Sequence, residues 1–160
     1  MAPTLLRVVL DTNILVRGLL NENSPSGRIL RASEERRIVP VLSLAVLGEY
    51  RTILSDPDLV EAYPQLDEHR VKTALERLWY VADVCRRIRV RFELPRDPKD
   101  SKLVELAIGG WATHLITTDR DLLDLGTGQS PAARKFRRHL PEIEVIKPHA
   151  FVEGWPGLFG

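Results

Sequence analysis

The stretch LLRVVL at residues 5–10 constrains the fold more than any other segment of the chain. It is a short and almost continuously apolar run, which is typical of a strand buried on both faces of a parallel sheet. Asp11 ends the run, and the next apolar segment, ILVRGLL at residues 14–20, has the spacing of a helix. The beginning of the chain therefore predicts a buried strand, a turn marked by a carboxylate, and a helix.

The same alternation of strand and helix continues along the chain. Further strands are expected at residues 37–43, 113–118 and 143–146. Further helices are expected at residues 26–36, 44–54 with Ser43 as N-cap, 67–79, from RDPKD (96–100) to about 109, and 131–139, and a small turn or helix is expected at 148–153. The remaining connections, 55–66 with its two prolines and 80–94, are expected to be a turn-rich loop and a mostly irregular segment. This order predicts one α/β domain over residues 1–160, with a parallel sheet flanked by helices on both faces.

The cysteine, histidine and charge content narrows the chemistry of any site. Cys85 is the only cysteine, so neither an intrachain disulfide nor a cysteine-based zinc site is expected, and the four histidines are scattered. Aspartate and glutamate are then the available metal ligands, and they favour a hard cation such as Mg²⁺ or Mn²⁺. The net charge of +1 gives no overall attraction to nucleic acid, and no apolar run predicts a signal peptide or a membrane span. We therefore expect a cytoplasmic protein with no membrane partner.

Three aspartates are expected to converge at one edge of the sheet. Asp11 and Asp119 each follow a predicted strand directly, and ligand sites of such folds lie where parallel strands end. Asp100 falls near the centre of the apolar face of its helix, which is an unusual place for a solvated acid. A capping role explains the neighbouring Asp97 better, because a capping carboxylate has no need to share the apolar face.

Two further acids have weaker support from the pattern alone. Glu49 lies at the border of the apolar face of helix 44–54, where a solvated glutamate is equally expected. Asp121, like Asp119, belongs to TTDRDLL, and both suit a turn or the cap of a following helix. For Asp121 we expect such a cap or a supporting position beside Asp119.

Several half-buried carboxylates at one edge would destabilise the fold unless a cation neutralised them. Two like charges about 4 Å apart repel by about 4 kcal/mol at an effective dielectric constant near 20. Such acids therefore take up protons or bind a divalent ion. An acidic pocket without histidine or cysteine is the kind of site that metal-assisted phosphodiester hydrolysis requires.

Three segments together resemble the PIN domain family, and especially its members that are toxin components of toxin–antitoxin systems. They are VVLDTNILVRGLL (8–20), LGEYRTIL (47–54) and RDPKDSKLVELAIGGWATHLITTDRDLL (96–123). The likeness covers roughly residues 6–125, which would hold the acidic site, while residues 126–160 would supply a C-terminal strand and tail. It implies a three-layer α/β/α fold.

The resemblance also implies an activity and the residues that perform it. The metal-binding and catalytic acids would be Asp11, Glu49, Asp100 and Asp119. Asp121 matches a position that sometimes adds to the site, and Asn13 and Thr118 match small polar positions that would orient carboxylates or water. The implied protein is a ribonuclease that hydrolyses RNA with one or two Mg²⁺ or Mn²⁺ ions. The metal would activate a water for in-line attack on phosphorus, with no covalent enzyme intermediate.

RNA must also be held, and two basic segments are candidates for this. The first is RRIRVRF at 86–92, and the second, RKFRRH, supplies Arg134, Lys135, Arg137 and Arg138. Base stacking is a candidate role for Phe92, Phe136 and Trp111. A charge run is equally expected on a solvated helix face, so both readings stay open.

Two other functions also stay open. A PIN-like module that binds RNA or a protein without cutting would keep the same acids. An aspartyl-phosphate enzyme also ends a strand in aspartate, but a phosphatase needs a second aspartate where this chain has Asn13, and a receiver needs adjacent acids before the nucleophile strand. Among partners, the toxin resemblance implies a small protein antitoxin and a homodimer.

Overall fold

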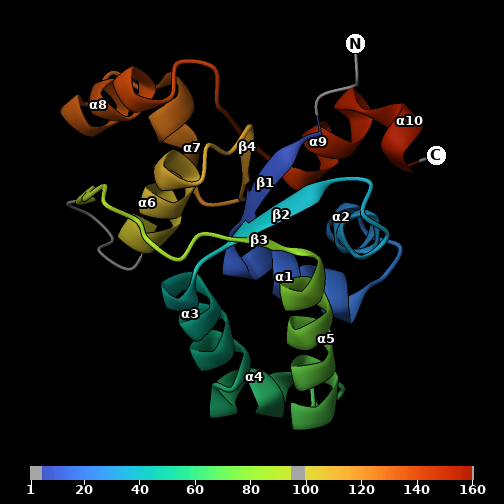
Figure 1. Cartoon of the computed structure of the whole chain (residues 1–160). Coiled ribbons are helices and arrows are strands. Elements are labelled where there is room, and N and C mark those ends of the chain that lie inside the picture. The colour runs from blue at the N-terminus through green and yellow to red at the C-terminus, as the bar shows by residue number, and fades with distance from the viewer. Residues whose placement is uncertain (1–4, 95–99, 160) are drawn as a thin grey trace.

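The computed structural model describes residues 5–94 and 100–159, which form a five-stranded sheet surrounded by helices (Figure 1). The strands are β1 (Arg7–Leu10), β2 (Val39–Leu42), β3 (Asp83–Val84), β4 (His114–Ile116) and β5 (Glu144–Ile146). The helices before β3 are α1 (Thr12–Leu20), α2 (Pro25–Glu34), α3 (Leu44–Leu54), α4 (Pro57–Ala62) and α5 (Glu68–Val81). The later helices are α6 (Ser101–Gly109), α7 (Arg120–Thr127), α8 (Pro131–His139), α9 (Pro148–Gly154) and α10 (Pro156–Phe159). None of these helices has the length and apolar content that crossing a membrane requires.

All neighbouring strands of the sheet are parallel, in the order β3-β2-β1-β4-β5. The central strand is β1, in which Val8 and Val9 have no exposed surface. Burial on both faces explains why the sequence of this strand is an apolar run rather than an alternation of apolar and polar residues. The predicted fold class, a parallel sheet with helices on both faces, is confirmed.

Helices cover the two faces of the sheet in two groups. On one side, α6 packs on β1 and β2, and α7 packs on β5 and α8. Figure 1 shows α1, α2 and α5 on the other side. The strand order explains this division, because the chain moves toward one sheet edge up to β3 and toward the opposite edge after it. Right-handed crossovers that run in opposite directions place their helices on opposite faces.

Side-chain caps set the beginnings of several helices where the sequence predicts them. The Ser43 hydroxyl accepts a hydrogen bond from the backbone N–H of Val46 at 3.1 Å, and α3 has the predicted bounds. Ser130 caps α8 in the same way, and that helix also has the predicted bounds. The predicted cap at Asp97 lies outside the described residues.

The connection at residues 55–66, predicted as a loop, contains the short helix α4. Pro57 is its first residue, and the Asp56 side chain accepts a hydrogen bond from the backbone N–H of Asp58 at 2.8 Å. The prediction was wrong because proline, read there as a breaker, is favoured in the first helical turn, where its missing N–H is not needed.

The segment at residues 80–94, predicted as mostly irregular, contributes one short strand. Asp83 and Val84 pair with Val41 and Leu42 of β2, which makes β3 an edge strand of the sheet. The rest of the segment, beyond Val84, is without regular structure, as expected. Two paired residues are too few to leave a periodic pattern in the sequence.

The C-terminal helices α9 and α10 pack against α2 and against each other. Phe151 and Phe159 are buried there with ring centroids 5.7 Å apart. The Arg28 guanidinium donates a hydrogen bond to the Phe159 carbonyl at 2.5 Å, and Arg37 donates one to the Leu158 carbonyl. The last ten residues, whose role the sequence pattern leaves open, therefore cover part of α2.

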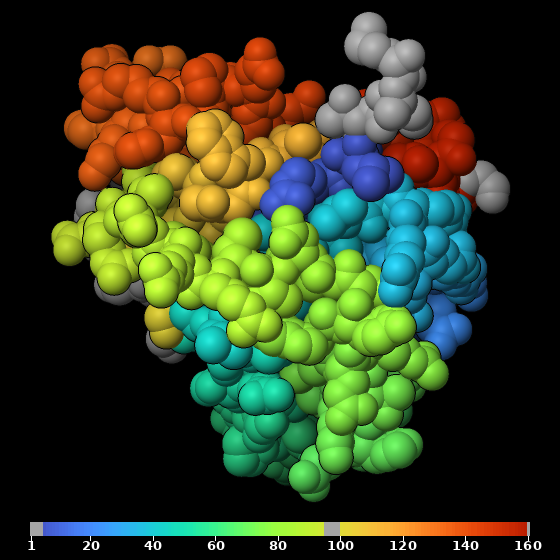
Figure 2. Space-filling model, in the orientation of Figure 1, coloured from blue at the N-terminus to red at the C-terminus, as the bar shows by residue number. Residues whose placement is uncertain are grey.

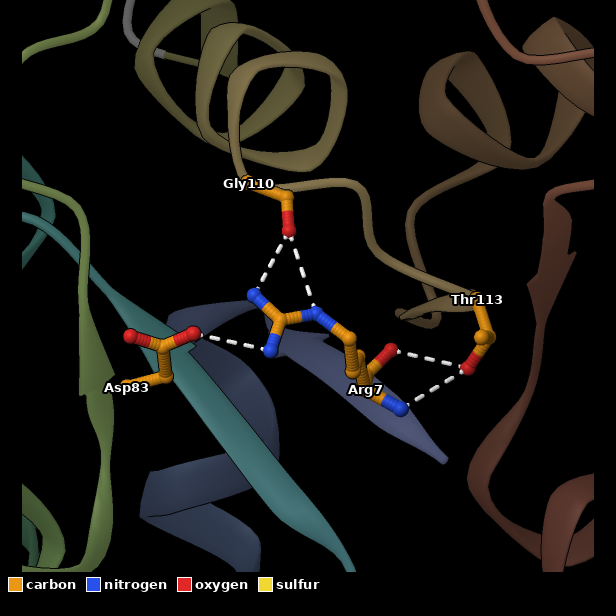
Figure 3. Close-up of polar contacts among 4 residues, drawn as sticks. All are labelled: Arg7, Asp83, Gly110 and Thr113. Atoms are coloured by element: carbon orange, nitrogen blue, oxygen red, sulfur yellow. Dashed lines mark hydrogen bonds and ion pairs between the residues drawn. The ribbon is translucent and has the colours of Figure 1, made fainter. Parts of the chain in front are cut away.

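A network around Arg7 joins several elements at the amino edge of the sheet (Figure 3). Its guanidinium is paired with Asp83 at 2.8 Å and donates hydrogen bonds to the Gly110 carbonyl at 2.8 and 3.2 Å. The Arg7 backbone N–H donates to Thr113 Oγ1 at 3.0 Å, and the Thr113 hydroxyl donates to the Arg7 carbonyl at 2.9 Å. Gly110 directly follows α6, so this network fixes the C-terminal end of α6 at the amino edge.

The helices α3, α4 and α5 project from the sheet as a lobe, which Figure 2 shows in blue-green and green at the bottom of the view. A groove of about 900 Å³ lies between these three helices. Leu44 and Tyr80 line it and are exposed. The lobe therefore presents apolar surface to solvent.

Candidate active site

The structure brings Asp11 and Asp119 to the same edge of the sheet. Asp11 directly follows β1, and its backbone N–H donates to the Ile116 carbonyl of β4 at 3.0 Å. Leu10 and Ile116 are paired in the parallel register of β1 and β4, which places Asp11 level with Thr117. Asp119 follows two residues later, so both acids lie at the carboxyl edge.

The Thr117 hydroxyl links the two aspartates. Its Oγ1 donates to Asp11 Oδ2 at 2.7 Å and accepts from the backbone N–H of Asp119 at 3.0 Å, and the residue has no exposed surface. This is the supporting role that the family resemblance implies for Thr118, which forms no hydrogen bond with either carboxylate in the described part of the chain. The register between β1 and β4 decides which threonine lies beside Asp11, and register cannot be read from a single strand's sequence.

Asp11 lies in an environment that disfavours its charge. The residue is 7% exposed, and its burial raises the pKa of the carboxyl group above the ordinary value. The charge of Asp119 raises this pKa further, whereas the hydrogen bond from Thr117 and the nearby backbone N–H dipoles of Thr12 and Asn13 lower it without cancelling the effect. Among residues 5–94 and 100–159, no lysine or arginine forms an ion pair with either aspartate.

Asp119 has a structural role besides its place beside Asp11. Its side chain accepts a hydrogen bond from the backbone N–H of Asp121 at 2.7 Å and so caps α7. The helix cap, which is the alternative role predicted for Asp119 from TTDRDLL, is therefore present. Asp121 itself is half-buried in the first turn of α7.

Glu49 lies on α3, and Asp100 directly precedes α6. Because α6 ends at the amino edge, its first turn and the half-buried Asp100 before it lie toward the carboxyl edge. Glu49 Oε1 lies 2.8 Å from Lys102 Nζ in an ion pair that joins α3 to the first turn of α6. The carboxylate of Glu49 is thus paired with a lysine that no motif in the sequence marks as part of the site.

Tyr50, beside Glu49 in the chain, fixes α3 to the end of β1. Its hydroxyl donates a hydrogen bond to the Leu10 carbonyl, directly before Asp11, and its side chain is fully buried. Burial, and to a smaller extent the charge of Asp11, raise the pKa of Tyr50 well above the ordinary value. The raised pKa favours the protonated hydroxyl, which donates the hydrogen bond to Leu10 at neutral pH.

The donor chemistry of the site suits a hard divalent cation, although the acids do not form a closed ligand set. Asp11 and Asp119 offer carboxylate oxygens, the ligands that Mg²⁺ and Mn²⁺ prefer, where two negative charges are disfavoured. Within the described ranges, however, no three acidic, histidine or cysteine side chains lie close enough to hold one ion together. The pair of Asp11 and Asp119 is the part of the predicted acidic site that the structure assembles, and the metal roles of Glu49, Asp100 and Asp121 stay predictions. Asn13 is exposed on α1, and its supporting role is likewise a prediction.

One of the two basic segments predicted to hold RNA, RKFRRH, lies on α8, whereas RRIRVRF at 86–92 has no regular structure and its contact with RNA stays a prediction. Arg137 donates to the Leu125 carbonyl at 3.1 Å and to the Gly128 carbonyl at 2.7 Å, which fixes α8 to α7 and engages its guanidinium within the fold. The other three are exposed on the helix surface: Arg134, Lys135 and Arg138. Contact of these three with RNA stays a prediction.

Of the aromatic residues predicted to stack on bases, two are in the core. Phe92 and Phe136 are 1% and 0% exposed, with ring centroids 6.2 Å apart. The prediction that they stack on RNA bases is therefore wrong, because their faces are covered by the protein itself. Trp111 is 74% exposed and its role is untested.

Comparison with known proteins bears on the family directly. The family described as PIN domain matches residues 7–121 of the chain. This chain belongs to the PIN domain family. MJ1680, an uncharacterized protein of Methanocaldococcus jannaschii, is 30% identical to this PIN domain over 120 residues, which cover 75% of each of the two chains. No solved structure matches this chain.

Family membership gives the acidic edge a chemical context. PIN domains are generally nucleases, and they generally use divalent metal ions. The matched segment of this PIN domain contains Asp11, Glu49, Asp100 and Asp119 and ends at Asp121. The resemblance of the three segments to the PIN domain family is thus confirmed at the level of the family.

Proposed function

We propose that this PIN domain is a metal-dependent endoribonuclease that hydrolyses phosphodiester bonds of RNA. The observation that supports this most is the pair of Asp11 and Asp119, with Asp11 buried, its pKa raised, and no cationic partner for either among the described residues. One or two Mg²⁺ or Mn²⁺ ions would be held by Asp11 and Asp119, with Asp100, Glu49 and Asp121 completing the ligand set. When bound, a metal ion makes water a stronger nucleophile and stabilises charge on the phosphate.

The chain's own residues would prepare the site for this reaction. Thr117 donates a hydrogen bond to Oδ2 of Asp11 and so fixes the orientation of this carboxylate. Because burial and Asp119 favour a proton on Asp11, protons and metal compete for this carboxylate. Glu49 would exchange its ion pair with Lys102 for a metal or for a water that it orients.

A cleavage assay with matched variants tests the proposal. The purified chain is incubated with a mixed RNA pool in Mg²⁺, in Mn²⁺ and in EDTA. We expect cleavage that requires metal and that falls by at least about 100-fold in Asp11→Asn, which keeps the size of the side chain but removes its charge. The control is Asp124→Asn, which removes an exposed aspartate of α7 and should cleave like the wild type.

Two results would contradict the proposal. If the wild type cuts no RNA with either metal, a module that binds RNA or a protein without cutting becomes the better interpretation. If Asp11→Asn cuts as fast as Asp124→Asn, the cleavage does not come from this site.

We also propose that the protein is the toxin of a toxin–antitoxin pair, acts in the cytoplasm, and has a small protein antitoxin and a second copy of itself as partners. The resemblance to toxin components supports this, and so does the exposed apolar surface at Leu44 and Tyr80 in the groove of the α3–α5 lobe. Expression of the wild type alone should arrest growth of a bacterial host, whereas Asp11→Asn should not. Light scattering of the purified chain measures its mass and so tests the homodimer separately. An active nuclease that leaves growth unchanged would contradict the toxin role.

A further inference from the structure

A hollow beside the candidate active site has basic side chains, but no acidic ones, among its described lining residues. It has a volume of about 360 Å³ and lies between α1, the start of α2, the chain after β4 and the start of α9. Its basic lining residues are Arg17, Lys147 and His149, and no carboxylate is among the described residues that line it. The other lining residues are two serines, two prolines and Thr118.

The two permanently charged side chains of this hollow have no acidic partner within the described chain. Arg17 and Lys147 are both exposed and form no ion pair, in contrast to Arg7 and Lys102, which are paired with Asp83 and Glu49. They come from elements far apart in the sequence, α1 and the residue that follows β5. Two unpaired cations from separate elements that line one concave surface create a local positive potential, although the net charge of the chain is only +1.

Thr118 relates this hollow to the acidic pair. It lines the hollow, and it lies between Thr117, which binds Asp11, and Asp119, which caps α7. A basic hollow and a pair of acids are thus direct neighbours at the carboxyl edge. A polynucleotide presents phosphates in series, so one phosphodiester at the metal-binding acids places a neighbouring phosphodiester within reach of the hollow.

We propose that Arg17 and Lys147, assisted by the imidazole of His149 and the hydroxyl of Thr118, bind a backbone phosphate of RNA next to the phosphate that is cleaved. The identity of the ligand as RNA rests on the proposed function, whereas attraction of an anion rests on the hollow itself. Contacts of lysine and arginine with phosphates position a strand but do not read bases. The hollow therefore sets the path of the RNA, which runs from the acids past the end of β4 toward the end of β5, and contributes no sequence preference.

The experiment measures how binding of RNA depends on salt. A fluorescein-labelled 12-nucleotide oligouridylate is titrated in Mg²⁺ with protein that carries Asp11→Asn, so that the RNA is not cut. Fluorescence anisotropy at several NaCl concentrations gives the Kd and the slope of log K against log salt. Arg17→Ala and Lys147→Ala are each added to this background. The matched control is Lys72→Ala, which removes an exposed lysine of α5, and circular dichroism checks that every variant is folded.

We expect Arg17→Ala and Lys147→Ala each to weaken binding several-fold at low salt. Each should also reduce the salt slope by about 0.7, the value for one phosphate contact on a single strand. Lys72→Ala should keep the Kd and the slope of the background. The inference is overturned if both hollow variants behave like Lys72→Ala, or if the background protein does not bind the oligonucleotide at all.

The phosphate group that binds in the hollow could also come from a free phosphate compound, and a competition experiment distinguishes this source from RNA. Inorganic phosphate and uridine monophosphate are added to the labelled complex in turn. If either binds as tightly as the oligonucleotide and loses that affinity in Arg17→Ala, the hollow is a site for a free phosphate compound and the RNA contact is overturned. The cleavage assay separates the two proposals. If the wild type cuts RNA but the Arg17→Ala and Lys147→Ala variants keep the full salt slope, only the phosphate-binding role of the hollow is refuted. If these variants lose slope but the wild type does not cut RNA, only the nuclease proposal is refuted.

Discussion

At the amino edge of the sheet, the Arg7 guanidinium forms an ion pair with Asp83 and donates to the Gly110 carbonyl. At the carboxyl edge, by contrast, Asp11 and Asp119 are both hydrogen-bonded to the Thr117 hydroxyl, and neither forms an ion pair with a cation among the described residues. The first arrangement satisfies a charge within the fold. The second holds a buried acid in a state where its pKa is raised. A charged group without an ion-pair partner in the protein is available to bind a ligand, whereas a fully paired group is not. The two edges therefore differ in role. The Arg7 network at the amino edge holds α6 and three strands together, whereas the aspartates at the carboxyl edge are available to bind a ligand.

The largest effect should follow from a change at the carboxyl edge. Asp119→Asn keeps a residue that caps helices well but removes one of the two charges that would hold the metal. We expect the rate of RNA cleavage to fall by about 100- to 1,000-fold, with little change in the melting temperature. Cleavage kinetics and thermal unfolding of the same preparation check this. A variant that unfolds at a much lower temperature would show that Asp119 serves the fold more than the site.

The opposite pattern is expected at the amino edge. Arg7→Met removes the hydrogen bonds to the buried Gly110 carbonyl and should lower the free energy of unfolding by about 2 kcal/mol. Asp83→Asn should cost less than about 1 kcal/mol, because the Asp83 side chain is 50% exposed and its ion pair is screened by solvent. Urea unfolding measures both. Cleavage per folded molecule should stay at the wild-type rate, and a loss of activity in folded Arg7→Met would break the division between the edges.

Thr117→Val tests the residue that links the two acids. Valine has nearly the same shape, but it removes the hydrogen bond that lowers the pKa of Asp11. The pKa of Asp11 should then rise further, and the acid limb of the pH profile of kcat/KM should move to higher pH. We expect a decrease in cleavage of about 10-fold at neutral pH, the size typical for loss of a group that orients a metal ligand. Thr127→Val, at an exposed threonine that ends α7, is the control and should leave the acid limb in place.

The smallest predicted effects are on stability as a function of pH, and they have opposite signs at the two edges. In EDTA, the carboxyl of Asp11 has a raised pKa in the folded state, so its contribution to stability is present at low pH and is lost as the pH rises from 3.8 through the folded pKa. His114 begins β4 at the amino edge, and burial lowers its pKa, so its contribution is lost as the pH falls from 6.5 through the folded pKa. The difference in unfolding free energy between the wild type and Asp11→Asn, and between the wild type and His114→Gln, isolates each term. A difference that does not change with pH would contradict the corresponding assignment.

Much of the frame that positions the site is readable from the sequence, because local signals determine it. An apolar run that ends at Asp11 predicts β1, and Ser43 predicts the start of α3. Ser130 and the basic segment after it give α8 its bounds in the same way. These features depend on residues within one turn or one strand of each other, which is the range over which propensity and capping act.

The misses concern contacts between segments that are distant in the chain. Thr117 rather than Thr118 holds Asp11 because of the register between β1 and β4. Lys102 pairs with Glu49 because α3 and α6 lie side by side. Phe92 is buried although its segment is rich in arginine, since it packs against Phe136 of α8. Each of these depends on tertiary packing, which no local pattern contains.

The helices that cover α2 have a practical consequence for anyone who wishes to shorten this protein. The PIN match ends at Asp121, yet β5, α9 and α10 all follow it and complete the sheet and the far side of the core. Truncation at the family boundary would turn β4 into an unprotected outer strand, free to pair with other molecules. It would also expose to solvent the apolar surface of α2 that α9 and α10 cover. We expect such a fragment to aggregate although it would retain every acid of the predicted site.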